Sequence, residues 1–125
     1  MTIAVWCLLA AALMPVIAAG ISKAGARFDN DAPRSSSEGL PGHRRRAHWA
    51  HLNCYEALPF FAAAVIVAEM KARPGAWLDG LALAFIAARL VYVALYVGGF
   101  PTLRSAMWGV AFAINIAIFT LPAWR

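Results

Sequence analysis

Four long apolar stretches dominate the sequence and decide what the chain can fold into. They lie at about residues 1–22, 47–70, 76–98 and 105–124. Each is close to the roughly 20 residues that an α-helix needs to cross about 30 Å of hydrocarbon. Runs of Ala, Leu and Ile favour helices over the alternating pattern of a membrane β-barrel. We therefore predict an all-α integral membrane protein with four spans, in a single domain covering residues 1–125.

Composition agrees with a membrane protein. Of the 125 residues, 62% are hydrophobic and 14% are charged, whereas soluble domains average about 45–50% apolar and about 25% charged residues. A soluble fold of this length could not bury so many apolar runs without exposing patches that promote aggregation. The first stretch ends in small residues like a secretory signal, but it lacks a basic segment at its start, so we expect a retained helix.

Basic residues predict the orientation of the spans. The polar segment 23–46 carries most of them and the third connection adds Arg104, whereas the opposite side has Lys71, Arg73 and Arg125. By the positive-inside rule, the first and third loops face the cytoplasm and both termini lie outside. Because the aromatic residues lie in the spans, we expect anionic lipid headgroups, and not nucleic acid, to be the partner of this charge.

The connections between the spans predict how they pack. Residues 71–75 (KARPG) and 98–102 (GGFPT) combine glycine with proline, which ends helices. Spans joined by so few residues pack antiparallel, which predicts an up-down four-helix bundle. The segment 23–46, rich in Gly, Pro and Ser, is predicted to be a cytoplasmic loop without a packed core.

Polar residues recur on one face of the second span and of the third. Arg46, Trp49, Asn53 and Glu56 follow the helical spacing i, i+3, i+7, i+10. Arg89, Tyr92 and Tyr96 form a second stripe at i, i+3, i+7. A charge at the bilayer centre costs from about 2.5 to more than 10 kcal/mol, so these side chains should face the bundle interior and find partners.

Depth matching suggests one such partnership. Glu56 lies about ten residues after Arg46, and Arg89 lies about ten residues before Gly99, so at 1.5 Å per residue both are roughly 15 Å deep. Antiparallel neighbours place these opposite charges at the same level. We therefore predict a structural ion pair between Glu56 and Arg89.

The remaining polar residues predict a ligand cleft near the cytoplasmic side. Asn53, Tyr92, Tyr96, Arg46 and Arg104 could hold an anionic ligand rich in amide groups, such as a small peptide. Arg104, at the start of the fourth span, could donate to a thiolate or oxyanion, aided by the positive end of the helix dipole. The alternative is an arginine that extends to lipid headgroups.

The histidines do not indicate a metal site. His48 and His51 are three residues apart on one helix, but zinc needs a third or fourth ligand, and the nearest acidic residues lie in an irregular loop. No phosphate-binding glycine loop, Ser-His-Asp order or zinc-protease motif is present. We expect no metal.

The polar residues resemble those of a known family, the membrane-associated proteins in eicosanoid and glutathione metabolism (MAPEG). RAHWAHLNCYEALPFF resembles the second-helix signature of that family, in which an Arg-Ala pair precedes Asn-x-x-Glu and then a proline beside aromatic residues. RLVYVALYVGGFPTLRS resembles its third helix and the entry to its fourth, and KAGARFDNDAPR resembles the first loop of its bacterial members. The resemblance spans the chain and implies a bacterial-type member of the inner membrane.

The resemblance implies a homotrimer that binds glutathione between adjacent subunits, near the cytoplasmic side. It implies activation of the glutathione thiolate toward a lipophilic electrophile or hydroperoxide, as in membrane glutathione transferases and peroxidases. By matching position, the residues implied in glutathione binding are Arg46, Asn53, Glu56, Tyr92 and Tyr96, and those implied in catalysis are Arg104 and Ser105. The alternative is a non-catalytic membrane protein whose buried polar residues lock the helices and the trimer, with weak or no glutathione binding.

Two positions depart from the family pattern or leave it open. Where the family commonly has a second arginine, one turn before the asparagine, this sequence has Trp49. The loss of that cation removes a charge-assisted bond to a glutathione carboxylate, of a kind worth about 1.5–3 kcal/mol. The basic contact from the end of the first helix could come from Lys23 or from Arg27.

Overall fold

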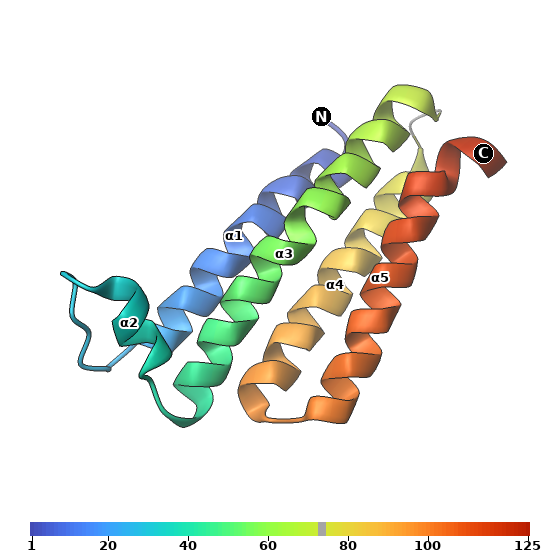
Figure 1. Cartoon of the computed structure of the whole chain (residues 1–125). Helices are drawn as coiled ribbons and strands as arrows, with labels where there is room; N and C mark the ends of the chain where they lie inside the picture. Colours follow the sequence, from blue (N-terminus) through green and yellow to red (C-terminus); the bar gives the residue numbers. More distant parts are fainter. Residues whose placement is uncertain (73–74) are drawn as a thin grey trace.

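The computed structural model of the protein describes residues 1–72 and 75–125, and within these ranges the secondary structure is entirely helical (Figure 1). The helices are α1 (Ile3–Lys23), α2 (Pro33–Glu38), α3 (Gly42–Lys71), α4 (Ala76–Gly98) and α5 (Pro101–Trp124). All of them except the short α2 are long and apolar enough to cross a membrane. The predicted all-α membrane bundle is therefore confirmed.

The long helices run alternately up and down the bundle. α1 packs chiefly against α3, and α4 packs chiefly against α5, while α3 also contacts both α4 and α5. Both termini, the last turn of α3 and the first turn of α4 lie at one end of the bundle, and α2 and the α4–α5 connection lie at the other, which we call the α2 end (Figure 1). Arg73 and Pro74, part of the predicted KARPG turn, lie outside the described residues.

Helices α3 and α5 begin earlier than the spans predicted from hydropathy. α3 begins at Gly42 and not near residue 47, and α5 begins at Pro101 and not at residue 105. Pro101 stands in the first turn of α5, where its fixed φ and missing N–H suit a helix start. Hydropathy therefore marks the apolar part of each helix, whereas the helix itself continues into the polar segment. The predicted loop 23–46 also contains α2, which likewise starts at a proline.

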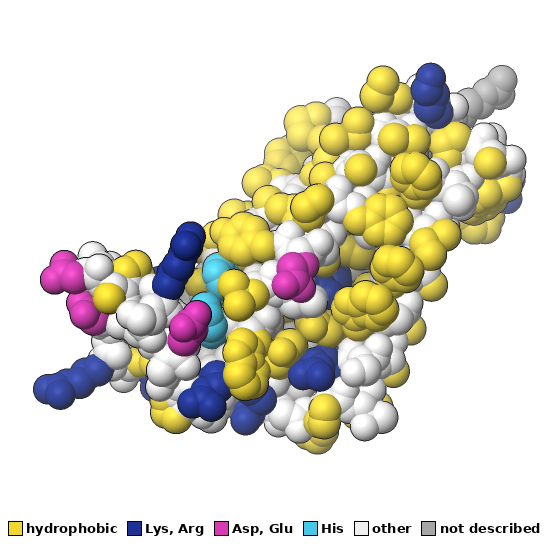
Figure 2. All heavy atoms as spheres, in the orientation of Figure 1, with side chains coloured by type: hydrophobic (Ala, Val, Ile, Leu, Met, Phe, Trp, Pro, Cys, Tyr) yellow, Lys and Arg dark blue, Asp and Glu magenta, His cyan; other side chains and the backbone are white. Residues whose placement is uncertain are grey.

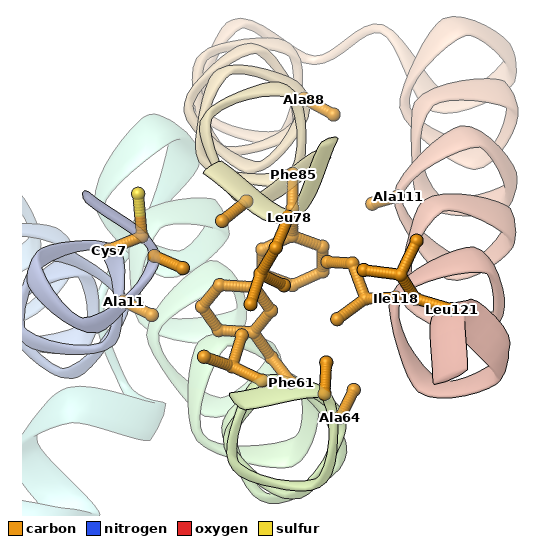
Figure 3. Close-up of a cluster of buried hydrophobic side chains, with 14 residues drawn as sticks. Cys7, Ala11, Phe61, Ala64, Leu78, Phe85, Ala88, Ala111, Ile118 and Leu121 are labelled. Atoms are coloured by element: carbon orange, nitrogen blue, oxygen red, sulfur yellow. The ribbon is translucent and has the colours of Figure 1, made fainter. Parts of the chain in front are cut away.

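A pair of aromatic rings forms the centre of the hydrophobic core. Phe61 of α3 and Phe85 of α4 stack face to face with their ring centroids 4.0 Å apart. Figure 3 shows Leu78, Ile118 and Leu121 around these rings, at the meeting point of α3, α4 and α5. Much of the rest of the core is alanine, whose small side chain lets helices approach closely in a membrane.

The first turn of α1 is closed by side chains from other helices. Thr2 Oγ1 accepts a hydrogen bond from Val5 N–H at 3.3 Å and donates one to Glu69 of α3. The Ala4 N–H donates to Asp79 Oδ1 of α4 at 2.8 Å. The bonds from Ala4 and Val5 satisfy N–H groups that have no partner within the helix, and the Thr2 hydroxyl links this end of α1 to α3, at the end of the bundle opposite α2.

Charged and apolar side chains are separated on the surface. On the face seen in Figure 2, most charged side chains lie toward the α2 end, and hydrophobic side chains cover most of the remainder. Large apolar residues such as Trp6, Ile17 and Leu90 are more than half exposed. This distribution suits a helix bundle surrounded by lipid acyl chains.

Candidate functional site

A cleft of about 580 Å³ opens between α3, α4 and α5, toward the α2 end. Its lining residues are Trp49, Leu52, Asn53 and Glu56 from α3, Tyr92 and Tyr96 from α4, and Arg104, Ser105 and Trp108 from α5. The cleft thus brings together the predicted site residues of three helices, with the exception of Arg46. Both an arginine and a carboxylate face one space, so the cleft presents opposite charges to a ligand.

Asn53 joins Arg89 to Glu56, so the predicted direct ion pair is not what the structure contains. Arg89 Nη2 donates to Asn53 Oδ1 at 2.9 Å, and Asn53 Nδ2 donates to Glu56 Oε2 at 3.2 Å. Among the residues described, no contact of ion-pair length links Arg89 to Glu56. The reason is position: Asn53 lies one turn before Glu56 on the same face of α3, so its amide fits between the buried guanidinium and the carboxylate.

The bridge leaves the two charges in different surroundings. The side chain of Arg89 is 2% exposed and also lies within 3.7 Å of Cys54 Sγ. Glu56 is an exposed residue that lines the cleft. The Asn53 amide therefore holds the Glu56 carboxylate in a fixed position relative to the buried Arg89, while the carboxylate remains available to a ligand.

Two arginines stack on two tyrosines along the wall of the cleft. The Arg104 guanidinium carbon lies 4.3 Å from the Tyr96 ring centroid, and that of Arg89 lies 4.3 Å from the Tyr92 ring centroid. The two tyrosine rings meet edge to face at 5.7 Å. Stacking fixes the plane of the Arg104 guanidinium, and no acceptor within residues 1–72 and 75–125 is hydrogen-bonded to it. Its N–H groups are therefore free for a bound anion.

Arg46 lies beside the cleft and not in it. Its Nε donates to the Val97 carbonyl at 3.0 Å, which ties α3 to the end of α4. It lines a separate hollow of about 260 Å³, whose wall also contains Tyr96, Gly99 and Arg104. Gly99 has φ +82°, in the left-handed region that favours glycine, and ends α4 next to the Arg46 guanidinium.

Trp49, the position that departs from the family pattern, forms part of the cleft wall and is 44% exposed. The Arg45 guanidinium carbon lies 5.9 Å from its ring centroid. Neither Lys23 nor Arg27 lines the cleft of the single chain. Lys23 instead places its Nζ 4.3 Å from the ring centroid of Phe28.

The sequence interpretation missed a deeper cavity of about 270 Å³, which shares Asn53, Glu56 and Trp108 with the cleft. We call it the Asn115 cavity, and its other lining residues are Ala57, Phe60, Phe85, Arg89, Ala111, Phe112 and Asn115. The sequence does contain a signal for it. Asn115 follows Arg104 and Trp108 at helical spacing, so a lone amide on the cleft face of the last span could have been identified.

The histidines of α3 have structural contacts. His48 and His51 stack with ring centroids 5.9 Å apart, and His51 Nδ1 forms a hydrogen bond of 2.7 Å with the Pro15 carbonyl of α1. No group of three or more His, Cys, Asp or Glu side chains in the described part of the chain is placed to hold a metal ion.

The sequence matches a known protein family. The model of the MAPEG family matches residues 3–124, nearly the whole chain. No curated protein and no solved structure matches the chain.

Proposed function

The chain belongs to the MAPEG family of membrane proteins, and from this premise we propose that it activates the thiol of glutathione toward a lipophilic electrophile or hydroperoxide. Membership supports a multi-pass membrane protein with a glutathione-related role. The single observation that carries the specific activity is the cleft in which Arg104, with free N–H groups, faces Glu56 and Asn53 across one space.

Arg104 is proposed to stabilise the thiolate. A free thiol has a pKa near 8.5, and only the thiolate is a strong nucleophile. Arg104 lies in the first turns of α5, where the positive end of the helix dipole adds to its own charge. Ser105, exposed in the same cleft, supplies a hydroxyl donor. These groups favour the anion over the thiol, so the proton passes to solvent at neutral pH.

The chemical step then needs no further protein group to form a bond. With an aryl chloride, the sulfur attacks the ring carbon, the C–S bond forms, and chloride leaves with the electron pair of the broken C–Cl bond. With a hydroperoxide, the sulfur attacks the terminal oxygen, the O–O bond breaks, and the alcohol leaves after taking a proton. A second glutathione then converts the sulfenic acid to the disulfide and water.

The polar groups of α3 and α4 are proposed to hold the peptide part of glutathione. The exposed Glu56 carboxylate suits the γ-glutamyl ammonium, and its bond from Asn53 keeps it oriented. Tyr92 and Tyr96 offer ring faces and hydroxyls on the opposite wall. The carboxylates of glutathione require cations, and Arg104 is the one basic residue among the described residues that line the cleft of one chain. A second subunit of the proposed homotrimer would supply the rest, through Lys23 or Arg27.

The basic α2 end is proposed to face the cytoplasm of a bacterial inner membrane, because positively charged loops remain on that side. This orientation would open the cleft toward the compartment in which reduced thiols persist.

The test is glutathione conjugation of chlorodinitrobenzene by the purified protein. Arg104→Ala should lower kcat/KM by about 100-fold or more, as expected for the loss of one donor to a developing or stabilised anion. Arg125→Ala is the matched control, since Arg125 also stacks on an aromatic ring, that of Trp77 at 4.6 Å, but at the opposite end. Equal activity of wild type and Arg104→Ala would refute the assigned role.

A second candidate is a non-catalytic membrane protein in which the polar residues join helices. The Arg89–Asn53–Glu56 bridge between α4 and α3 favours it, because this network has a structural use without any ligand. In that case calorimetry would detect no glutathione binding, and Glu56→Gln would lower thermal stability without a catalytic effect.

A further inference from the structure

Asn115 is a buried polar side chain of α5 that the proposed glutathione chemistry does not use. It is 2% exposed, and its buried Oδ1 has no hydrogen-bond partner among the residues that the structure describes. Thr120, on the same helix, shows how a membrane helix ordinarily satisfies such a group, since its Oγ1 donates to the Ile116 carbonyl at 2.9 Å. Asn115 has no such internal solution, and a buried amide oxygen without a donor is destabilising.

The surroundings of Asn115 are those of a binding pocket. The Asn115 cavity of about 270 Å³ has apolar walls that include Phe60, Phe85 and Phe112. It adjoins the cleft, because Asn53, Glu56 and Trp108 line both spaces. Concave, mainly apolar sites with a few convergent polar groups are typical of small-molecule binding. The cavity therefore lies where an apolar molecule could be held beside a thiolate bound at Arg104.

The polar lining of the cavity narrows the class of molecule. Arg89 also lines the cavity, and it can only donate hydrogen bonds, whereas the unpartnered Asn115 Oδ1 can only accept them. A hydroxyl group can donate to Asn115 Oδ1 and can also accept a hydrogen bond from a donor such as Arg89. An ether or a halide of the same shape lacks the proton that Asn115 needs.

We propose that the Asn115 cavity is a subsite for a lipophilic substrate that carries a hydroxyl group, and that Asn115 selects this group by accepting its hydrogen bond. The inference rests on the proposed function for the identity of the bound molecule as a substrate. Binding of such a molecule in the Asn115 cavity can be measured separately, in the absence of glutathione.

The test is a comparison of para-trifluoromethylphenol with para-trifluoromethylanisole by fluorine NMR, on the whole protein in detergent micelles, with empty micelles as the reference for partitioning. Wild type should bind the phenol roughly 2- to 10-fold more tightly than the anisole, the range expected for one net hydrogen bond. Asn115→Leu and the smaller Asn115→Ala should each abolish this preference. Thr120→Val, which removes a polar group of α5 outside the cavity, should retain it.

A second measurement separates the subsite from a structural role. Asn115→Leu removes a buried polar group without a partner, so it should leave the free energy of unfolding unchanged or raise it. A large loss of stability in both Asn115 variants would instead indicate a structural amide and would overturn the proposal. So would a phenol preference that survives in either variant, or its absence in wild type. Arg104→Ala should keep the phenol preference, so a failure of the proposed thiol chemistry would be distinguishable from a failure of the subsite.

Discussion

The bridge through Asn53 leads to a quantitative prediction about stability. Arg89 is 2% exposed, so the loss of an acceptor leaves its guanidinium poorly solvated. Its bond to Asn53 Oδ1 at 2.9 Å is a hydrogen bond from a charged donor, a class worth about 1.5–3 kcal/mol. Asn53→Ala should therefore lower the free energy of unfolding by about that amount. In an Arg89→Met background the same change should cost little, because the buried donor is gone.

A double-mutant cycle isolates this coupling from the other effects of each substitution. We expect a coupling energy of about 1.5–3 kcal/mol between Asn53 and Arg89. Glu56 is exposed and reaches Arg89 only through the amide, so the Glu56→Gln and Arg89→Met cycle should give about 0.2–1 kcal/mol, as for exposed pairs.

The free energy of unfolding can be measured by titrating sodium dodecyl sulfate into mixed micelles and following tryptophan fluorescence. A cycle between Arg89→Met and Arg125→Ala, at the opposite end of the bundle, should be additive. Coupling of Glu56 to Arg89 as large as that of Asn53 to Arg89 would refute the bridge and restore the direct ion pair.

Three further substitutions test the site and the fold. Glu56→Gln should weaken glutathione binding about 10- to 100-fold in calorimetry, because a charge-assisted bond to the ammonium is lost. Asp29→Asn, in the exposed loop, should leave the affinity unchanged. Equal affinities of wild type and Glu56→Gln would exclude this contact. Trp49→Arg should tighten glutathione binding by about 10-fold or more, because it places a cation on the cleft wall, and Trp49→Phe should not. An affinity of Trp49→Arg equal to that of wild type would show that the ligand carboxylates lie elsewhere. Asp79→Ala should lower the free energy of unfolding by about 1 kcal/mol through loss of the bond from Ala4 N–H, and an unchanged value would contradict that cap.

Much of the fold could be predicted because a membrane imposes strong rules on sequence. Span length and hydropathy predicted the four long helices, and the glycine and proline residues of GGFPT predicted the turn between α4 and α5. The helix starts at Gly42 and Pro101 were misplaced because an α-helix does not end where the hydrocarbon ends. Polar residues such as Arg44 and Arg45 continue α3 beyond the apolar stretch. Proline in the first turn of α2 and of α5 is the local signal that the hydropathy argument did not use.

Side-chain pairing was less predictable than helix position. Helical spacing placed Asn53 and Glu56 on one face, and the structure places both in the cleft. The depth estimate used only the 1.5 Å rise per residue along each helix. Asn53 and Glu56 are one turn apart, so this estimate could not decide which of their side chains contacts Arg89. The answer depends on rotamers and on the crossing of α3 with α4. Asn115 was missed for another reason, since a single amide in an apolar span attracts attention only when its neighbours across the bundle are known.

The closed first turn of α1 has a consequence for how the protein is made. The bond between Ala4 N–H and Asp79 joins residues 75 positions apart, and the bond from Thr2 to Glu69 spans 67 positions. A ribosome synthesises the chain from its N-terminus, so all of α1 has been made before either carboxylate exists. Its first turn then remains open until α3 and α4 have been inserted beside it. Helix α1 precedes α3 and α4 in the chain, yet its first turn acquires all of its side-chain partners only when α4 packs against it.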